Sequence, residues 1–184
     1  MSNKRTIYAD DNCESIGTLF KLRYPSLIIG LFLGIGISFI TSSFEEVLAR
    51  NVQIVFFLPF IVYTADAIGT QTEAIYSRGL RTKKAKFSDY LIKELSLGLI
   101  FGLTFGIVSS AVTLLWLHDT LISLSVGIAS FIAITTAPIV ALIVAQALQS
   151  IHKDPAAGTG PIATVFQDMI SIVIYGIVCS IIIL

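Results

Sequence analysis

Charged residues and cysteines are both scarce in this chain of 184 residues. Only 13% of the residues are charged, about half the share found in soluble domains, so the chain is not an ordinary soluble protein. Twelve Lys and Arg balance twelve Asp and Glu, and this zero net charge excludes nucleic acid as a leading partner. The two cysteines, Cys13 and Cys179, lie near opposite ends, so neither a disulfide framework nor a zinc or copper site is indicated.

Long uncharged runs are abundant instead. A helix needs roughly 20 apolar residues to cross the hydrocarbon core of a membrane, and three runs reach this length without a charge: 24–44, 95–117 and 120–151. Two further runs are interrupted only by acids, which are Asp66 and Glu73 in 52–77 and Asp168 in 161–184. The sequence therefore predicts an all-α integral membrane protein with five transmembrane helices.

The distribution of Lys and Arg predicts the orientation of these helices. If the N-terminus is cytoplasmic, eleven of the twelve positive charges lie inside and only Arg50 lies outside. We therefore expect a multi-pass protein of the cell (inner) membrane with its N-terminus in and its C-terminus out. Residues 1–23 would form a retained cytoplasmic leader, with a helix around residues 16–22, and residues 24–184 the membrane domain.

The three acids inside the spans are the first candidates for function, because an ionisable residue in a membrane normally faces a cavity or a partner. Asp66 and Glu73 are seven residues apart, so on a helix they share one face at a separation of roughly 10 Å. Thr70 shares that face. Asp168, in the fifth span, is expected at a depth between them.

These carboxylates have no Lys or Arg in the same spans, so a bound cation is the economical way to balance them. Oxygen ligands suit hard ions such as Mg²⁺, Ca²⁺ or Mn²⁺. The candidate metal ligands are Asp168, Asp66, Glu73, Thr70, Gln71 and Thr164, with Glu94 at the pore mouth.

Structural interpretations of the same residues stay open at this stage. A buried acid can be protonated and bonded to a neighbouring helix, and Glu73 is near enough to the membrane interface to reach Arg78 or Arg81. Glu94 can form an interfacial pair with the adjacent Lys93.

Glycine and proline indicate where helices pack and where they start. Small-residue spacing predicts packing faces at Gly30, Gly34 and Gly36 in the first span and at Gly98, Gly102 and Gly106 in the third. Pro59 and Pro138 are expected inside the second and fourth spans. Residues 154–161 are expected to be a short loop, with Pro161 in the first turn of the fifth span.

The order of short motifs over about 160 residues resembles the transmembrane domain of the MgtE magnesium transporter family, which is similar to eukaryotic solute-carrier magnesium transporters. The motifs are Phe44-Glu45, Pro59, Gly69-Thr70-Gln71, Arg78-Gly79-Leu80, residues 91–95, Asp154-Pro155, Gly160-Pro161, Asp168 and Ile174-Tyr175. The resemblance implies a homodimer of five-helix domains, with a pore lined by the second and fifth helices. It also implies that Asp168 holds Mg²⁺ as the ion loses its water.

Two departures from the family pattern affect the expectation. The family carries cytoplasmic domains that sense Mg²⁺, and we expect this chain to lack them. Asp66 and Glu73 stand where the family has neutral residues, which gives three pore carboxylates per protomer.

The leading hypothesis is a divalent cation channel or transporter, with Mg²⁺ first and Mn²⁺ or another divalent ion as the alternative, in contact with membrane lipids. A proton-coupled carrier or exporter is a variant of this hypothesis, because intramembrane acids also carry protons. A non-transporting scaffold subunit is the second hypothesis. An intramembrane hydrolase is the weakest, since no nucleophile accompanies the acids, and we expect no enzymatic activity.

Overall fold

The computed structural model describes residues 12–82, 85–150 and 155–184, and within these ranges the chain is helical with no strand. The elements are α1 (Ile16–Ser42), α2 (Glu45–Arg50), η1 (Val52–Phe57, a 3₁₀ helix), α3 (Leu58–Arg81), α4 (Phe87–Leu117), α5 (Thr120–Ser150) and α6 (Pro155–Ile183). Five segments are long and apolar enough to cross a membrane, in agreement with the five predicted spans: Ile16–Ser42, Val52–Leu80, Phe87–Leu117, Thr120–Ala147 and Ile162–Ile183.

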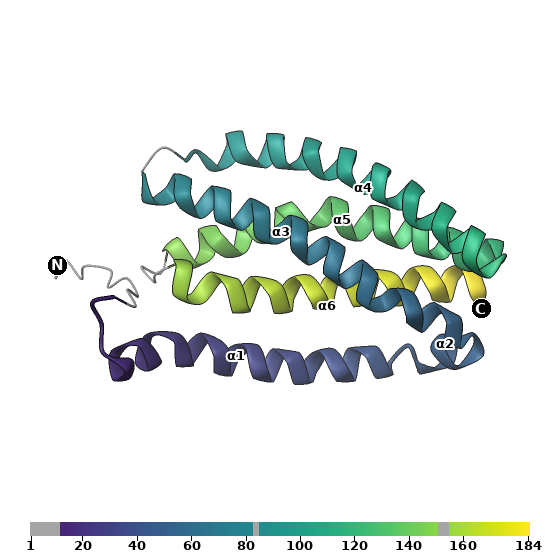
Figure 1. The fold of residues 1–184 in the computed structure, drawn as a ribbon, viewed down its shortest axis with the longest axis horizontal. Coiled ribbons are helices and arrows are strands. Elements are labelled where there is room, and N and C mark those ends of the chain that lie inside the picture. The colour runs from purple at the N-terminus through teal and green to yellow at the C-terminus, as the bar shows by residue number, and fades with distance from the viewer. Residues whose placement is uncertain (1–11, 83–84, 151–154) are drawn as a thin grey trace.

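Helix α1 starts well before the first predicted span. Ser15 caps it, because its hydroxyl accepts a hydrogen bond from the backbone N–H of Thr18 at 3.3 Å. The helix then continues through Pro25 to Ser42 without a break at the predicted leader boundary of residue 23. Figure 1 shows α1 lying along one side of the bundle beside α6, and most of its surface is open.

The second span consists of two helices rather than one. Asn51 caps η1 by accepting from the backbone N–H of Gln53 at 3.1 Å, and α3 follows directly. Pro59 lies inside the second span, as predicted, and it stands in the first turn of α3. A proline fits this first turn because its missing N–H would have no partner inside the helix. Pro138 lies inside α5, as predicted.

The helix that contains the fifth span starts earlier than predicted. Helix α6 begins at Pro155, so residues 155–161 are helical and the expected loop over 154–161 is wrong. The proline in the first turn is Pro155 rather than Pro161, and it fits there for the same reason as Pro59. The predicted loop residue Asp154 lies outside the described residues.

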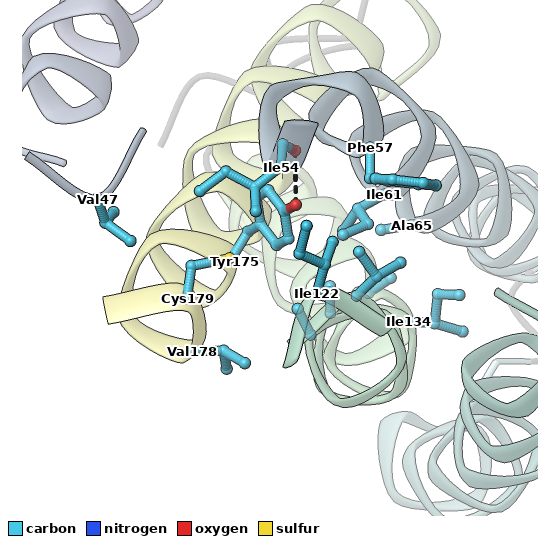
Figure 2. Packing of buried hydrophobic residues seen from close by; sticks show 14 of the residues in the cluster. Val47, Ile54, Phe57, Ile61, Ala65, Ile122, Ile134, Tyr175, Val178 and Cys179 are labelled. Atoms are coloured by element: carbon cyan, nitrogen blue, oxygen red, sulfur yellow. Dashed lines mark hydrogen bonds between the residues drawn. The ribbon is translucent and has the colours of Figure 1, made fainter. Parts of the chain in front are cut away.

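Helix α5 is the centre of the bundle and contacts α3, α4 and α6 (Figure 1). The core that it shares with η1, α3 and α6 contains Ile54, Ile61, Ile122, Ile134 and Tyr175 among its fully buried side chains. Figure 2 shows the Tyr175 ring reaching η1, where its hydroxyl donates a hydrogen bond to the carbonyl oxygen of Ile54 at 2.6 Å. This bond closes one end of the core.

Close packing of α4 on α5 depends on the three glycines of α4. A Cβ at Gly98 would lie 2.9 Å from the carbonyl oxygen of Thr135, and one at Gly106 would lie 2.9 Å from that of Gly127. The predicted packing face of the third span is therefore confirmed. The face predicted in the first span is wrong within this chain for Gly34 and Gly36, since a Cβ at either meets nothing within 4 Å.

Replacing Gly102 should destabilise the α4–α5 contact. In Gly102→Ala the new methyl group would collide with the Thr135 hydroxyl and lie 2.7 Å from the carbonyl oxygen of Phe131, so the helices must separate. We expect a loss of about 1–3 kcal/mol in the free energy of unfolding and a lower melting temperature in detergent. Gly34→Ala is the matched control and should melt no lower than the wild type. Equal melting of the two variants would contradict this account of the interface.

Candidate functional site

A small cavity lies between α3 and α6, and it gathers acidic and other oxygen-bearing side chains. Its lining residues are Asp66, Gly69, Thr70 and Glu73 from α3, Ala163, Thr164 and Gln167 from α6, and Ala141 from α5. Asp66 and Glu73 share one face of α3, because seven residues are almost two full turns of a helix. The structure thus brings together four of the predicted site residues: Asp66, Glu73, Thr70 and Thr164.

Small side chains let α3 and α6 enclose a cavity rather than a filled contact. Gly69, Ala141 and Ala163 line it without filling it, and its volume of about 10 Å³ is close to the room that one water molecule needs. The carboxyl groups of Asp66 and Glu73 are half-buried, and Asp66 repels Glu73 electrostatically. Two acids facing one small polar space are costly to keep charged unless something positive lies between them.

Asp168 is next to this cavity but does not line it. The side chain is half-buried on α6, and it is close enough to Asp66 for electrostatic repulsion. Gln167 and Asp168 lie on opposite sides of Thr164 around the helix, and Gln167 takes the position at the cavity. Within the described ranges, no three Asp, Glu, His or Cys side chains are close enough to hold one metal ion. One protomer therefore does not collect all three predicted acids in a single site.

Gln71 and Glu94 lie elsewhere. Gln71 is exposed and points about 140° around α3 from Asp66, so it is not part of the cavity. Glu94 on α4 is only 8% exposed, and its carboxyl group accepts a hydrogen bond from the Thr72 hydroxyl at 2.7 Å. The alternative of an interfacial pair between Glu94 and Lys93 is therefore not supported, because Glu94 turns inward and joins α4 to α3.

Helix α3 is also held by a second polar contact. The Tyr76 hydroxyl donates to Oε1 of Gln146 on α5, and the Tyr76 ring packs edge-on against Phe87 and Tyr90 of α4. Glu73 forms no ion pair with Arg78 among the described side chains, and the side chain of Arg81 lies outside them. These contacts hold the flank of α3 next to the cavity, while Asp66 and Glu73 face the cavity that α3 shares with α6.

Gln167 is the cavity residue that the sequence reasoning missed. It is 3% exposed and lies directly before Asp168. Attention to ionisable residues alone passes over a neutral amide in an apolar span, although such a side chain also needs partners inside a membrane. Its position one turn after Thr164 is the signal that could have revealed it.

Comparisons with known proteins identify the family of the chain. The MgtE family model, described as a divalent cation transporter, matches residues 58–178, about two thirds of the chain. The chain belongs to the MgtE family. The matched region contains α3, α4, α5 and most of α6, and hence every residue that lines the cavity.

Three curated relatives carry the name magnesium transporter MgtE. The chain is 30% identical to the Enterococcus faecalis protein over 156 residues, which is 83% of this chain and 34% of the relative. It is 28% identical to the Bacillus subtilis protein over 156 residues (83% and 35%) and 26% identical to the Thermus thermophilus protein over 160 residues (85% and 35%). The MgtE chain described here thus spans about a third of the length of these relatives.

The Thr72–Glu94 contact should stabilise this MgtE chain. Thr72→Val keeps the shape of the side chain but leaves the buried Glu94 carboxyl group without its donor, so we expect a loss of about 1–3 kcal/mol in the free energy of unfolding. Thermal melting in detergent measures it. The double variant Thr72→Val/Glu94→Leu should lose less than the sum of its two single variants, and strict additivity would contradict the contact.

Proposed function

We propose that the chain moves a divalent metal cation, with Mg²⁺ as the first substrate to test, across the cell membrane along the acidic face between α3 and α6. The observation that carries the proposal is the cavity lined by Asp66 and Glu73 in a chain of the MgtE family. The names of the three relatives support Mg²⁺ as the substrate.

The chemistry of the cavity favours a hard cation. Its oxygen donors are two carboxyl groups, the hydroxyls of Thr70 and Thr164 and the amide of Gln167. Mg²⁺ and Mn²⁺ prefer such ligands, and Mg²⁺ usually keeps several waters when it binds a protein. The small volume of the cavity fits an ion that has given up part of its water, with the acids offsetting that loss.

A homodimer would complete the ion path. Asp168 is half-buried and lies outside the cavity of its own protomer, so a second copy related by a two-fold axis can place its own Asp168 opposite the first. Two carboxylates that face each other would hold a hydrated cation between protomers. The cavities of the two copies would then flank this central position.

The charge distribution supports a cytoplasmic N-terminus and an external C-terminus. Eleven of the twelve Lys and Arg residues fall on the proposed cytoplasmic side, among them Arg78, Lys86 and Lys93 near the ends of α3 and α4. This orientation places the acids of the cavity toward the cytoplasmic half of α3 and α6.

Flux of Mg²⁺ and Mn²⁺ into proteoliposomes tests the ion path. Asp168→Asn removes the charge that faces the proposed central position, and we expect flux to fall at least about tenfold, as for loss of a metal-coordinating group. Asp66→Asn should also reduce flux. The matched control is Asp89→Asn, an exposed acid in the first turn of α4, which should transport like the wild type.

The outcomes separate the proposal from its competitors. Undiminished flux in Asp168→Asn would refute the role of this acid. Flux that appears only with an imposed pH gradient would assign a proton-coupled carrier. This alternative mechanism is the first to test, because the paired acids of the cavity can also carry protons. No flux of any divalent ion by the wild type would favour a scaffold subunit.

Labelling of the native cysteine tests the orientation. Cys13 is exposed and Cys179 is buried, so a membrane-impermeant maleimide should react at Cys13 alone. We expect no labelling in intact cells and full labelling after permeabilisation. Asp119→Cys, between α4 and α5, supplies the opposite control and should be labelled in intact cells. Labelling of Cys13 in intact cells would reverse the proposed topology.

A further inference from the structure

Gln167 has a buried oxygen atom for which the described residues offer no partner. The side chain is 3% exposed and lines the cavity between α3 and α6, and its Oε1 atom accepts no hydrogen bond from the part of the chain that the structure describes. Buried amide oxygens in proteins are almost always bonded. An unbonded one at the wall of a polar cavity points to a group that the cavity is built to receive.

The orientation of this amide is fixed by Ser171. The Ser171 hydroxyl donates its hydrogen to the carbonyl oxygen of Gln167 at 2.8 Å, so its oxygen is left as an acceptor. Nε2 of Gln167 donates a hydrogen bond to the hydroxyl oxygen of Ser171 at 3.2 Å. A flipped amide would set Oε1 against an oxygen that has no hydrogen to give. The bond to Ser171 therefore orients the NH₂ group of Gln167 toward Ser171 and leaves Oε1 unbonded.

The remaining donors of the cavity are all oxygen atoms. Asp66 and Glu73 supply two carboxyl groups from α3, and Thr70 and Thr164 supply hydroxyls from both helices. A third acid does not complete the set, because Asp168 lies outside the lining residues. Gln167 lines the same cavity, so its unbonded amide oxygen is available as a further ligand.

We propose that Asp66, Glu73 and Gln167 form a divalent cation subsite within one protomer, separate from the position of Asp168, and that Gln167 supplies its neutral oxygen ligand. This subsite rests on the proposed cation transport and adds a second ion-binding position to the transport path. A neutral amide contributes an oxygen without a third negative charge, so it lets the cation bind without trapping it. Exchange of an ion between this subsite and Asp168 then needs only a short step along α6.

Mn²⁺ binding to the purified full chain tests the subsite, followed by the loss of the free-ion signal in electron paramagnetic resonance. The test uses the Asp168→Asn background, in which the central position is disabled. We expect Mn²⁺ binding to persist there, to be competed by Mg²⁺, and to weaken at least about tenfold when Gln167→Met is added. Methionine keeps the length of the side chain and removes the amide oxygen.

Two companion variants control for folding and for general amide loss. Gln167→Glu restores an oxygen at the same place and should recover Mn²⁺ binding in the Asp168→Asn background. Gln53→Met replaces an exposed glutamine of η1, far along the chain from the cavity, and should bind like the background. A melting temperature for each variant identifies any that is merely unfolded, and the recovery in Gln167→Glu then decides the role of the oxygen.

The outcomes distinguish this subsite from the proposed transport. The subsite would be overturned if Asp168→Asn alone lost all Mn²⁺ binding while the wild type still transported the ion. The proposed transport would then stand, and the cavity would hold only water. Unchanged binding in Gln167→Met would overturn the role of Gln167 in the same way. A wild type that neither binds nor moves any divalent cation would overturn both.

Discussion

A polar side chain inside a membrane has no water to bond with, and this constraint accounts for most of the polar contacts in the bundle. Several hydroxyls satisfy it locally by donating to a carbonyl oxygen one turn back, as Thr64, Ser125 and Thr136 do. Others satisfy it between helices, as Thr72 does with Glu94. The α3–α6 cavity departs from this pattern, because two carboxyl groups and an unbonded amide oxygen meet there. The proposed transport of a cation would give these unpaired groups a partner.

The position of the cavity follows from the packing of the other helices. Glycines on α4 let it approach the backbone of α5, and α5 in turn supports both α3 and α6. Tyr76 and Thr72 attach a neighbouring flank of α3 to α5 and α4. With that flank held, Asp66 and Glu73 face the cavity between α3 and α6. The site is therefore a consequence of the small-residue packing as much as of the acids themselves.

The sequence predicts the features that depend on one helix at a time. The length of the apolar runs predicts the five spans, and the seven-residue spacing predicts that Asp66 and Glu73 share one helix face. Features that depend on a second helix were missed or misjudged. Glu94 was expected near the interface, but its partner Thr72 belongs to another span. Gln167 was passed over because an amide carries no charge, and its significance comes from the cavity that α3 completes.

Helix starts form a third category, in which local chemistry competes with hydropathy. Pro59 and Pro155 each stand in the first turn of a helix, at positions that apolar run length does not mark as helix starts. Ser15 similarly extends α1 beyond its apolar run. Capping and proline geometry set these ends, and hydropathy does not register either.

Side-chain hydrogen bonds between helices are unevenly distributed over the described part of the bundle. The bond between the Tyr175 hydroxyl and the carbonyl oxygen of Ile54 joins α6 to η1. Side-chain hydrogen bonds between Ser109 and Ser130 and between Ser110 and Ser123 fasten α4 to α5. Across the described part of α3 and α6 no such bond is present, and the Tyr175 bond to η1 lies at the far end of α6 from the cavity. A cation held between α3 and α6, as proposed, would therefore link two helices that no such bond joins, and its departure would remove that link.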